Sequence, residues 1–139
     1  MSFLNEIRNF LEDYTDLEAI NPNVDINRDL GVDGDDFDKM MDKYSKNYEI
    51  DMANYRWYFH SGEEAWNPGN IFFKAPYQRV DRIPVTPTML AKFIPEGKWG
   101  LEYPPNHLPE NRYDLLINRI ISAIMIIVVG GILIYKYTR

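Results

Sequence analysis

The residues of this chain that could do chemistry are mainly carboxylates, and their spacing first suggests a calcium loop. Counted from Asp25, oxygen donors fall at positions one, three, five, nine and twelve: Asp25, Asn27, Asp29, Asp33 and Asp36. A calcium loop of this kind needs a glycine at position six for its sharp turn and a bidentate glutamate at position twelve. Leu30 stands at position six and an aspartate at position twelve. We therefore expect a plain turn, with loose cation binding left open.

Other combinations of reactive residues give weaker indications of catalysis. His60 and His107 are the only histidines and lie too far apart in sequence to form a zinc motif. Glu63 and Glu64 could act as an acid and base pair, although adjacent carboxylates beside a turn are usually just solvated. Ser45 lies within a predicted helix and lacks a nucleophile elbow. Because the chain also has no glycine-rich phosphate loop and no cysteine, we expect no enzyme activity, metal, cofactor or small-molecule substrate.

The element that must position the carboxylates after Asp33 is an amphipathic helix. Gly31 and Gly34 mark a turn, and Asp33 is suited to cap the helix that follows. One face is apolar at three- and four-residue steps and is predicted to enter the core: Phe37, Met40, Met41, Tyr44 and Tyr48. The opposite face is acidic: Asp35, Asp38, Asp42 and Glu49. This face either stabilises the helix through pairs such as Asp42 with Lys46 or docks a partner, and the two interpretations carry equal weight.

At the start of this helix the chain resembles the acyl carrier proteins. Residues 29–33, Asp-Leu-Gly-Val-Asp, match the turn before the second helix of carriers, which reads Asp-Leu-Gly-x-Asp-Ser-Leu. Gly34 replaces the serine that carriers load with phosphopantetheine, and Asp35 replaces the leucine. Without a hydroxyl there is nothing to esterify, so the resemblance implies a carrier-like helical bundle that is not acylated. Since partner enzymes read the acidic second helix of carriers, it also implies that a partner binds Asp35, Asp36, Asp38, Asp42 and Glu49.

The soluble part as a whole also resembles a little-characterised enterobacterial family of carrier-like small proteins. Its members share the glycine substitution, an aromatic middle and a proline-threonine-leucine segment that ends in Gly-x-Trp, here residues 97–99. That family has no established activity to carry over.

Two more helices are predicted in the soluble part. Ser2 is a suitable N-cap for a first helix with apolar residues at helical spacing: Phe3, Leu4, Ile7, Phe10, Leu11 and Tyr14. This stretch lacks the basic start, apolar run and cleavage site of a secretory signal, so we expect the domain to begin in the cytoplasm. Thr86 and Pro87 open a last soluble helix that carries Leu90, Phe93 and Ile94, and Pro95 and Gly97 are expected to stop it.

Between these helices lies an insertion rich in aromatic residues. Five large rings fall between residues 54 and 66: Tyr55, Trp57, Tyr58, Phe59 and Trp66. Such rings are more often core than binding platform, yet five exceed what a small core must absorb. Trp57, Phe59 and Trp66 are therefore predicted to contribute to partner binding. Residues 71–73, Ile-Phe-Phe, are expected to form a short strand or a buried loop anchor.

The C-terminal part is predicted to be a membrane anchor. Residues 100–112 contain three prolines and are expected to form a stiff tether, which leaves 1–99 as the soluble domain and 113–137 as the anchor. Residues 115–135 are apolar apart from Asn118, Arg119 and Ser122, and would span about 31 Å as a helix. A buried core helix is the alternative, but about 110 residues can hardly surround one. We expect a single-pass protein of the bacterial inner membrane with its N-terminal domain in the cytoplasm.

The charge of the chain is unevenly distributed and restricts its partners. Residues 1–55 carry 14 acids and 5 bases, a net charge of -9, whereas residues 112–139 carry 1 acid and 4 bases, a net charge of +3. The acidic half repels phosphate backbones, so nucleic acid is not expected as a ligand and a protein with a basic surface is. Two hypotheses follow: a membrane-tethered interaction module, or an immunity or antitoxin-type protein that neutralises a toxin by binding it.

Overall fold

The computed structural model describes residues 2–139 and is mainly helical, as the sequence predicts. The α-helices are α1 (Phe3–Thr15), α2 (Ile26–Asp29), α3 (Gly34–Asn47), α4 (Pro87–Glu96) and α5 (Tyr113–Thr138). Three single 3-10 turns lie in the aromatic insertion: η1 (Trp57–Phe59), η2 (Pro68–Ile71) and η3 (Pro76–Gln78). Within residues 2–139 the one strand-like pairing is an isolated parallel bridge between Asp51 and Lys98.

The predicted first and last soluble helices form with the expected caps. The Ser2 side chain accepts a hydrogen bond from the backbone N–H of Asn5 at 3.2 Å, and the Thr86 side chain accepts one from Met89 at 3.1 Å. Pro95 does not stop α4 as expected, because it lies inside the last turn of the helix. Gly97 alone ends α4, with a left-handed φ of 70° that an L side chain rarely adopts.

The acidic helix α3 has the predicted orientation. Its core face is buried at Phe37, Met40, Met41 and Tyr44, and Tyr48 just after the helix is half-buried. The Tyr44 hydroxyl donates to the Leu90 carbonyl at 2.7 Å and so joins α3 to α4. Asp33 occupies the N-cap position, as predicted, but its side chain makes no capping hydrogen bond.

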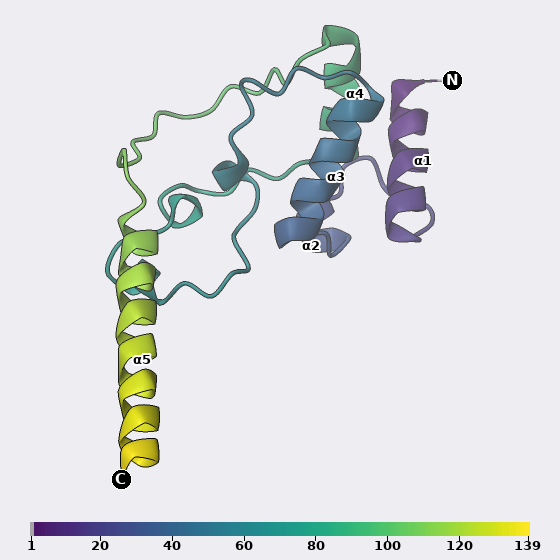
Figure 1. The fold of residues 1–139 in the computed structure, drawn as a ribbon. Coiled ribbons are helices and arrows are strands. Elements are labelled where there is room, and N and C mark those ends of the chain that lie inside the picture. The colour runs from purple at the N-terminus through teal and green to yellow at the C-terminus, as the bar shows by residue number, and fades with distance from the viewer. Residues whose placement is uncertain (1) are drawn as a thin grey trace.

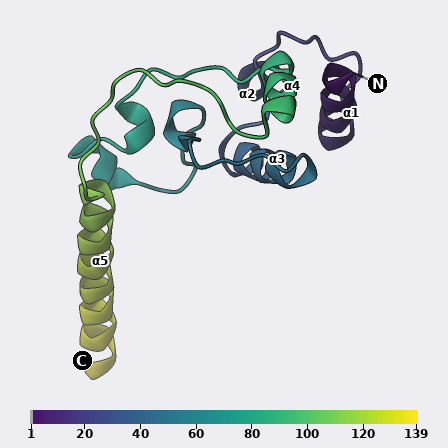
Figure 2. The same ribbon diagram turned by 90° about the horizontal axis from the view of Figure 1, so that it is seen from above.

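Helices α1 to α4 lie together at one end of the molecule, and α5 projects from the other end (Figures 1 and 2). The helices α1, α3 and α4 enclose the main core, whose largest buried side chains include Phe37, Tyr44 and Trp99. The long first loop contains α2, and the Ile26 N–H donates to the Val85 carbonyl at 3.0 Å. The aromatic insertion lies between this bundle and the start of α5.

The segment 100–112 is extended, but it is not a free tether. Leu101 and Tyr103 pack against the core, and the Tyr103 hydroxyl accepts a hydrogen bond from the Trp99 indole at 2.8 Å. The Tyr58 hydroxyl donates to the Asn106 side chain at 3.2 Å. The prolines keep this segment out of helices and strands, yet its aromatic and amide side chains still contact the insertion.

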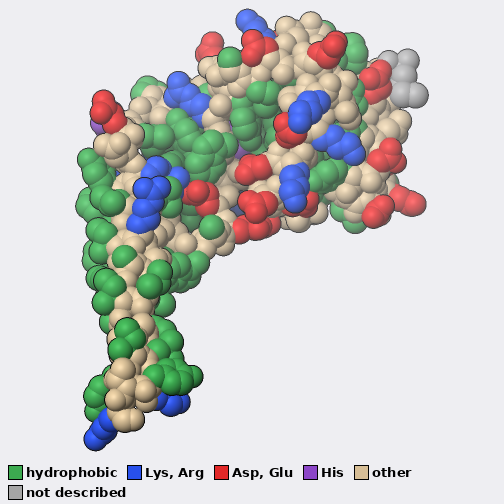
Figure 3. All heavy atoms as spheres, viewed as in Figure 1, with side chains coloured by type: hydrophobic (Ala, Val, Ile, Leu, Met, Phe, Trp, Pro, Cys, Tyr) green, Lys and Arg blue, Asp and Glu red, His purple; other side chains and the backbone are tan. Residues whose placement is uncertain are grey.

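Helix α5 is long and apolar enough to cross a membrane. None of its most apolar eighteen-residue window is buried against the rest of the chain, which argues against the core-helix alternative. On the face seen in Figure 3, hydrophobic side chains cover this helix, and acidic side chains gather on the bundle.

Candidate partner-binding site beside the acidic helix

An open cavity lies where α3 meets the aromatic insertion. It has a volume of about 530 Å³, and we refer to it as the acidic cavity. Its lining combines residues from both elements: Asp35, Asp38, Trp57, Gly62, Glu63, Glu64 and Ala65. Three of these, Asp35, Asp38 and Trp57, belong to the residues that the sequence predicts for partner binding. The structure thus brings the acidic face and the aromatic insertion together at one place.

Helix geometry and a buried histidine position these groups. Asp35 and Asp38 are three residues apart on α3 and therefore lie on one face of the helix. Trp57 begins the turn η1, which is anchored by the buried side chains of Phe59 and His60. The His60 ring lies 2.8 Å from the Ile83 carbonyl through Nδ1 and 2.8 Å from the Tyr103 hydroxyl through Nε2.

The hydrogen bonds of His60 define its tautomer. A carbonyl can only accept, so Nδ1 carries a proton, and in the neutral ring Nε2 accepts from the Tyr103 hydroxyl. Burial lowers the pKa of His60 to about 4. The hydrogen bond to the Ile83 carbonyl opposes this shift, and nearby Arg82 adds a smaller effect in the lowering direction. The ring is therefore neutral at physiological pH and acts as a structural support for the cavity wall.

The cavity favours positive charge. Burial raises the pKa of Asp38, and the hydrogen bond that its carboxylate accepts from the Ser61 hydroxyl at 3.2 Å opposes this rise. The negative charges of Asp35 and Glu63 raise the pKa of Asp38 further. Of the four cavity carboxylates only Glu63 has a basic partner among residues 2–139, the Arg112 guanidinium at 2.9 Å. A cation placed here would relieve the repulsion among the carboxylates and contact the Trp57 ring.

Gly34 lies at the edge of this site and is covered by Glu64. It has a left-handed φ of 54°, and a Cβ atom at this position would overlap the Glu64 carboxylate. A side chain at position 34 would therefore have to displace the Glu64 side chain of the insertion.

The other predicted site residues lie outside the cavity. Asp36 accepts a hydrogen bond from the Tyr14 hydroxyl at 2.7 Å, and Asp42 pairs with Lys46 at 2.7 Å on the open face of α3. Glu49 is exposed just beyond the end of α3, at a φ of 54°. Phe59 is buried in the core, so it is not on the surface, whereas Trp66 is exposed.

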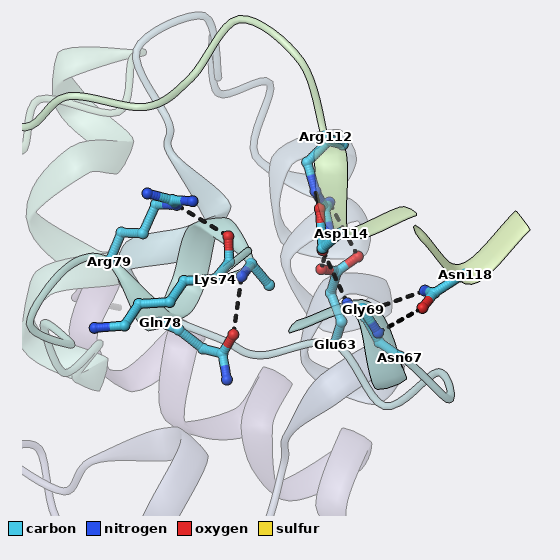
Figure 4. A network of polar contacts seen from close by, with 10 residues as sticks. Glu63, Asn67, Gly69, Lys74, Gln78, Arg79, Arg112, Asp114 and Asn118 are labelled. Carbon is cyan, nitrogen blue, oxygen red and sulfur yellow. Dashed lines mark hydrogen bonds and ion pairs between the residues drawn. The ribbon is translucent and has the colours of Figure 1, made fainter. Parts of the chain in front are cut away.

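Two of the cavity acids, Glu63 and Glu64, were not among the residues predicted to bind a partner, and the cluster that holds Glu63 was not predicted either. Glu63 belongs both to the cavity and to a group that we call the polar clasp: Glu63, Asn67, Gly69, Arg112, Asp114 and Asn118 (Figure 4). The clasp fixes the start of α5 to the insertion. Asn118 was the available signal, because an amide in an otherwise apolar helix needs hydrogen-bond partners.

The residues of the calcium-loop pattern do not converge. Asp25 caps α2 by accepting from the Arg28 N–H at 3.3 Å, and it also pairs with Arg82. Asp29 accepts from the Asp25 N–H at 2.8 Å. In the described part of the chain, no group of three or more His, Asp or Glu side chains is arranged to hold a metal ion.

One comparison with known proteins gives a match. The family model described as a protein of unknown function (DUF1493) matches residues 3–102, which include the acidic cavity but end before α5. No curated protein and no solved structure matches the chain.

Proposed function

Because the chain belongs to the DUF1493 family, whose function is unknown, we propose its function from its own surface: a membrane-anchored module that binds a basic segment of a protein partner. In this proposal α5 is the anchor, and the acidic cavity receives a lysine or arginine side chain of the partner.

The observation that carries the proposal is the composition of the cavity. Asp35, Asp38 and Glu64 lack a basic partner among the described residues, and Trp57 offers an indole ring beside them. A cation over an indole ring contributes about 0.5–1 kcal/mol at an exposed site, and a charge-assisted hydrogen bond to a carboxylate adds about 1.5–3 kcal/mol. A single basic side chain can contact the indole ring and a carboxylate at the same time. The cavity should therefore bind a short basic segment more tightly than a flat acidic surface without an aromatic ring would.

The proposal includes a carrier-like domain that has no prosthetic group. Its support is Gly34, which offers no hydroxyl and lies under the Glu64 carboxylate. We place the domain on the cytoplasmic side of a bacterial inner membrane. The support for membrane attachment is α5, which is long and apolar enough to cross a bilayer.

Copurification at two salt concentrations tests the binding proposal. The tagged full chain is extracted in mild detergent and compared with Asp35→Lys/Asp38→Lys, with Asp42→Lys as a matched control on the same helix outside the cavity. Added salt screens exposed charges beyond about 10 Å at 0.1 M, so capture should decrease as salt rises. The double variant should lose the captured protein and the control should keep it. Equal capture by all three chains would contradict the proposal.

A further inference from the structure

Large apolar side chains are exposed in residues 66–73, which we call the apolar loop. The exposed fractions are 65% for Trp66, 82% for Ile71 and 68% for Phe72, and Phe73 is also exposed. The prediction that residues 71–73 form a strand or a buried anchor is therefore wrong. No strand in the described chain pairs with them, and their side chains are exposed at the end of η2 and just after it. Single exposed apolar residues are normal, but a group of this size indicates an interaction surface.

The loop is continuous with the apolar surface of α5. The rings of Phe73 and Tyr113 lie 5.4 Å apart between centroids, and both ribbon views show η2 beside the first turns of α5 (Figures 1 and 2). On the face shown in Figure 3, hydrophobic side chains continue from α5 onto the domain where the helix begins.

The polar clasp holds the loop at a fixed level along α5. The Gly69 N–H donates to the Asn118 side-chain oxygen at 2.7 Å, and the Asn118 amide donates to the Asn67 side-chain oxygen at 2.8 Å. The Asn67 amide in turn donates to the Asp114 carboxylate at 2.9 Å. The loop therefore lies beside residues 114–118 of the helix (Figure 4).

The length of α5 determines where this level falls relative to a bilayer. Residues 120–135 follow the last charged residue near the start of the helix and number sixteen, or about 24 Å at about 1.5 Å per residue. That is shorter than the hydrocarbon core of about 30 Å. With residues 115–119 included, the span has twenty-one residues and a length of about 31 Å, which puts the membrane boundary near the level where Gly69 and Asn67 contact the helix.

We propose that the apolar loop rests in the lipid bilayer, at the boundary between headgroups and acyl chains, as a second membrane contact beside α5. This inference depends on the proposed function only in taking α5 as a membrane span. Trp66 and Tyr113 then act as interfacial aromatic residues, and Ile71, Phe72 and Phe73 contact the acyl chains.

Basic side chains around the loop suit lipid headgroups. Lys74 and Arg79 line a cavity of about 210 Å³ next to Tyr113, and Arg119 lines another of about 380 Å³. Arg112 lines both cavities but is paired with Glu63 and Asp114. Lys74, Arg79 and Arg119 lie at the level where phosphate groups of anionic lipids are expected. Since Glu63 belongs to both the clasp and the acidic cavity, the loop also holds that cavity at the membrane surface.

Depth measurement with spin labels tests the inference. Because the chain contains no cysteine, each single-cysteine variant carries its label at one known position. The full chain is reconstituted in nanodiscs of phosphatidylcholine and phosphatidylglycerol. Labels are placed at Ile71→Cys and Phe72→Cys, whose exposed side chains are not needed for folding. Lys46→Cys serves as the aqueous reference and Ile126→Cys as the bilayer reference. Accessibility to oxygen, which concentrates in lipid, is compared with accessibility to a water-soluble nickel complex.

The labels at positions 71 and 72 should show several-fold lower access to the nickel complex than the label at position 46, and higher access to oxygen. If the label at position 126 is lipid-exposed while the labels at positions 71 and 72 have the same accessibilities as the label at position 46, the loop does not touch the bilayer. The inference is then overturned, whether water or a protein covers the loop. If position 126 itself is water-accessible, α5 is not an anchor and the proposed function fails with it.

Discussion

Replacing Gly69 by alanine should release α5 from the domain. A Cβ atom at this position would overlap the backbone oxygen of Asp114, which cannot rotate away as a side chain could. The cheapest relief is separation of the two segments. Separation breaks the three hydrogen bonds of the clasp that join Gly69, Asn67, Asn118 and Asp114. Arg112, which precedes the helix, can keep its contacts with Asp114 and Glu63.

The size of the effect follows from those three hydrogen bonds. Each contributes about 1 kcal/mol net, so their loss is worth about 3 kcal/mol, or roughly two orders of magnitude in the docked-to-undocked ratio. Gly62→Ala is a matched control in the same insertion. Its Cβ would meet the Tyr77 ring at 3.4 Å, an ordinary contact, and neither glycine has a positive φ that would add backbone strain.

The assay is a distance distribution between two spin labels on the full chain in nanodiscs. Labels at Lys46→Cys on α3 and Ser122→Cys on α5 report how the helix is held against the domain. The parent and the Gly62→Ala variant should give one narrow distribution, and the Gly69→Ala variant a broad one. An unchanged narrow distribution for Gly69→Ala would refute the clasp as the joint between domain and helix.

Three further predictions concern pH, modification and membrane association. The pKa of His60 is about 6.5 in the unfolded chain and about 4 in the folded one, so the unfolded chain takes up the proton first as pH falls. The free energy of unfolding should therefore decrease between pH 6.5 and pH 4, by about 3 kcal/mol in total. In denaturant titrations at several pH values, the His60→Gln variant should lack this contribution to the pH dependence. Coexpression with a broad-specificity phosphopantetheinyl transferase should leave the intact mass unchanged, because Gly34 has no hydroxyl; a gain of one prosthetic group would contradict this. The full chain should stay with membranes in carbonate and high salt, since α5 is apolar over its length, and release by salt alone would show that it does not span.

The helical framework could be predicted because periodicity is a local signal. The buried residues Phe37, Met40, Met41 and Tyr44 repeat at helical spacing, and so do Ile7, Phe10 and Leu11. The apolar run of α5 is equally local. These patterns determine which face of each helix is buried, independently of its neighbours.

The candidate site could be predicted only in part because it depends on contacts distant in sequence. Asp35, Asp38 and Trp57 follow from charge and aromatic content, but their meeting with Glu63 and Glu64 depends on the path of the insertion. Phe59 has the same character as Trp57 in the sequence and yet is buried.

The polar clasp could not be predicted from the sequence. Asn67 is typical of a turn and Asp114 of a helix start, and 47 residues separate them. The position of the joint between α5 and the domain therefore emerges only from the folded structure.

Photocrosslinking from position 57 in living cells is the most direct test of the central claim that a basic segment of a partner occupies the acidic cavity. A photoreactive phenylalanine analogue replaces Trp57, and a second chain carries it at exposed Ala53 as a control. We expect one crosslinked partner from position 57, and this crosslink should be lost when Asp38→Lys is added and retained with Asp42→Lys. Position 53 should give no crosslink. A crosslink from position 57 that survives Asp38→Lys, or no crosslink from it at all, would contradict the claim.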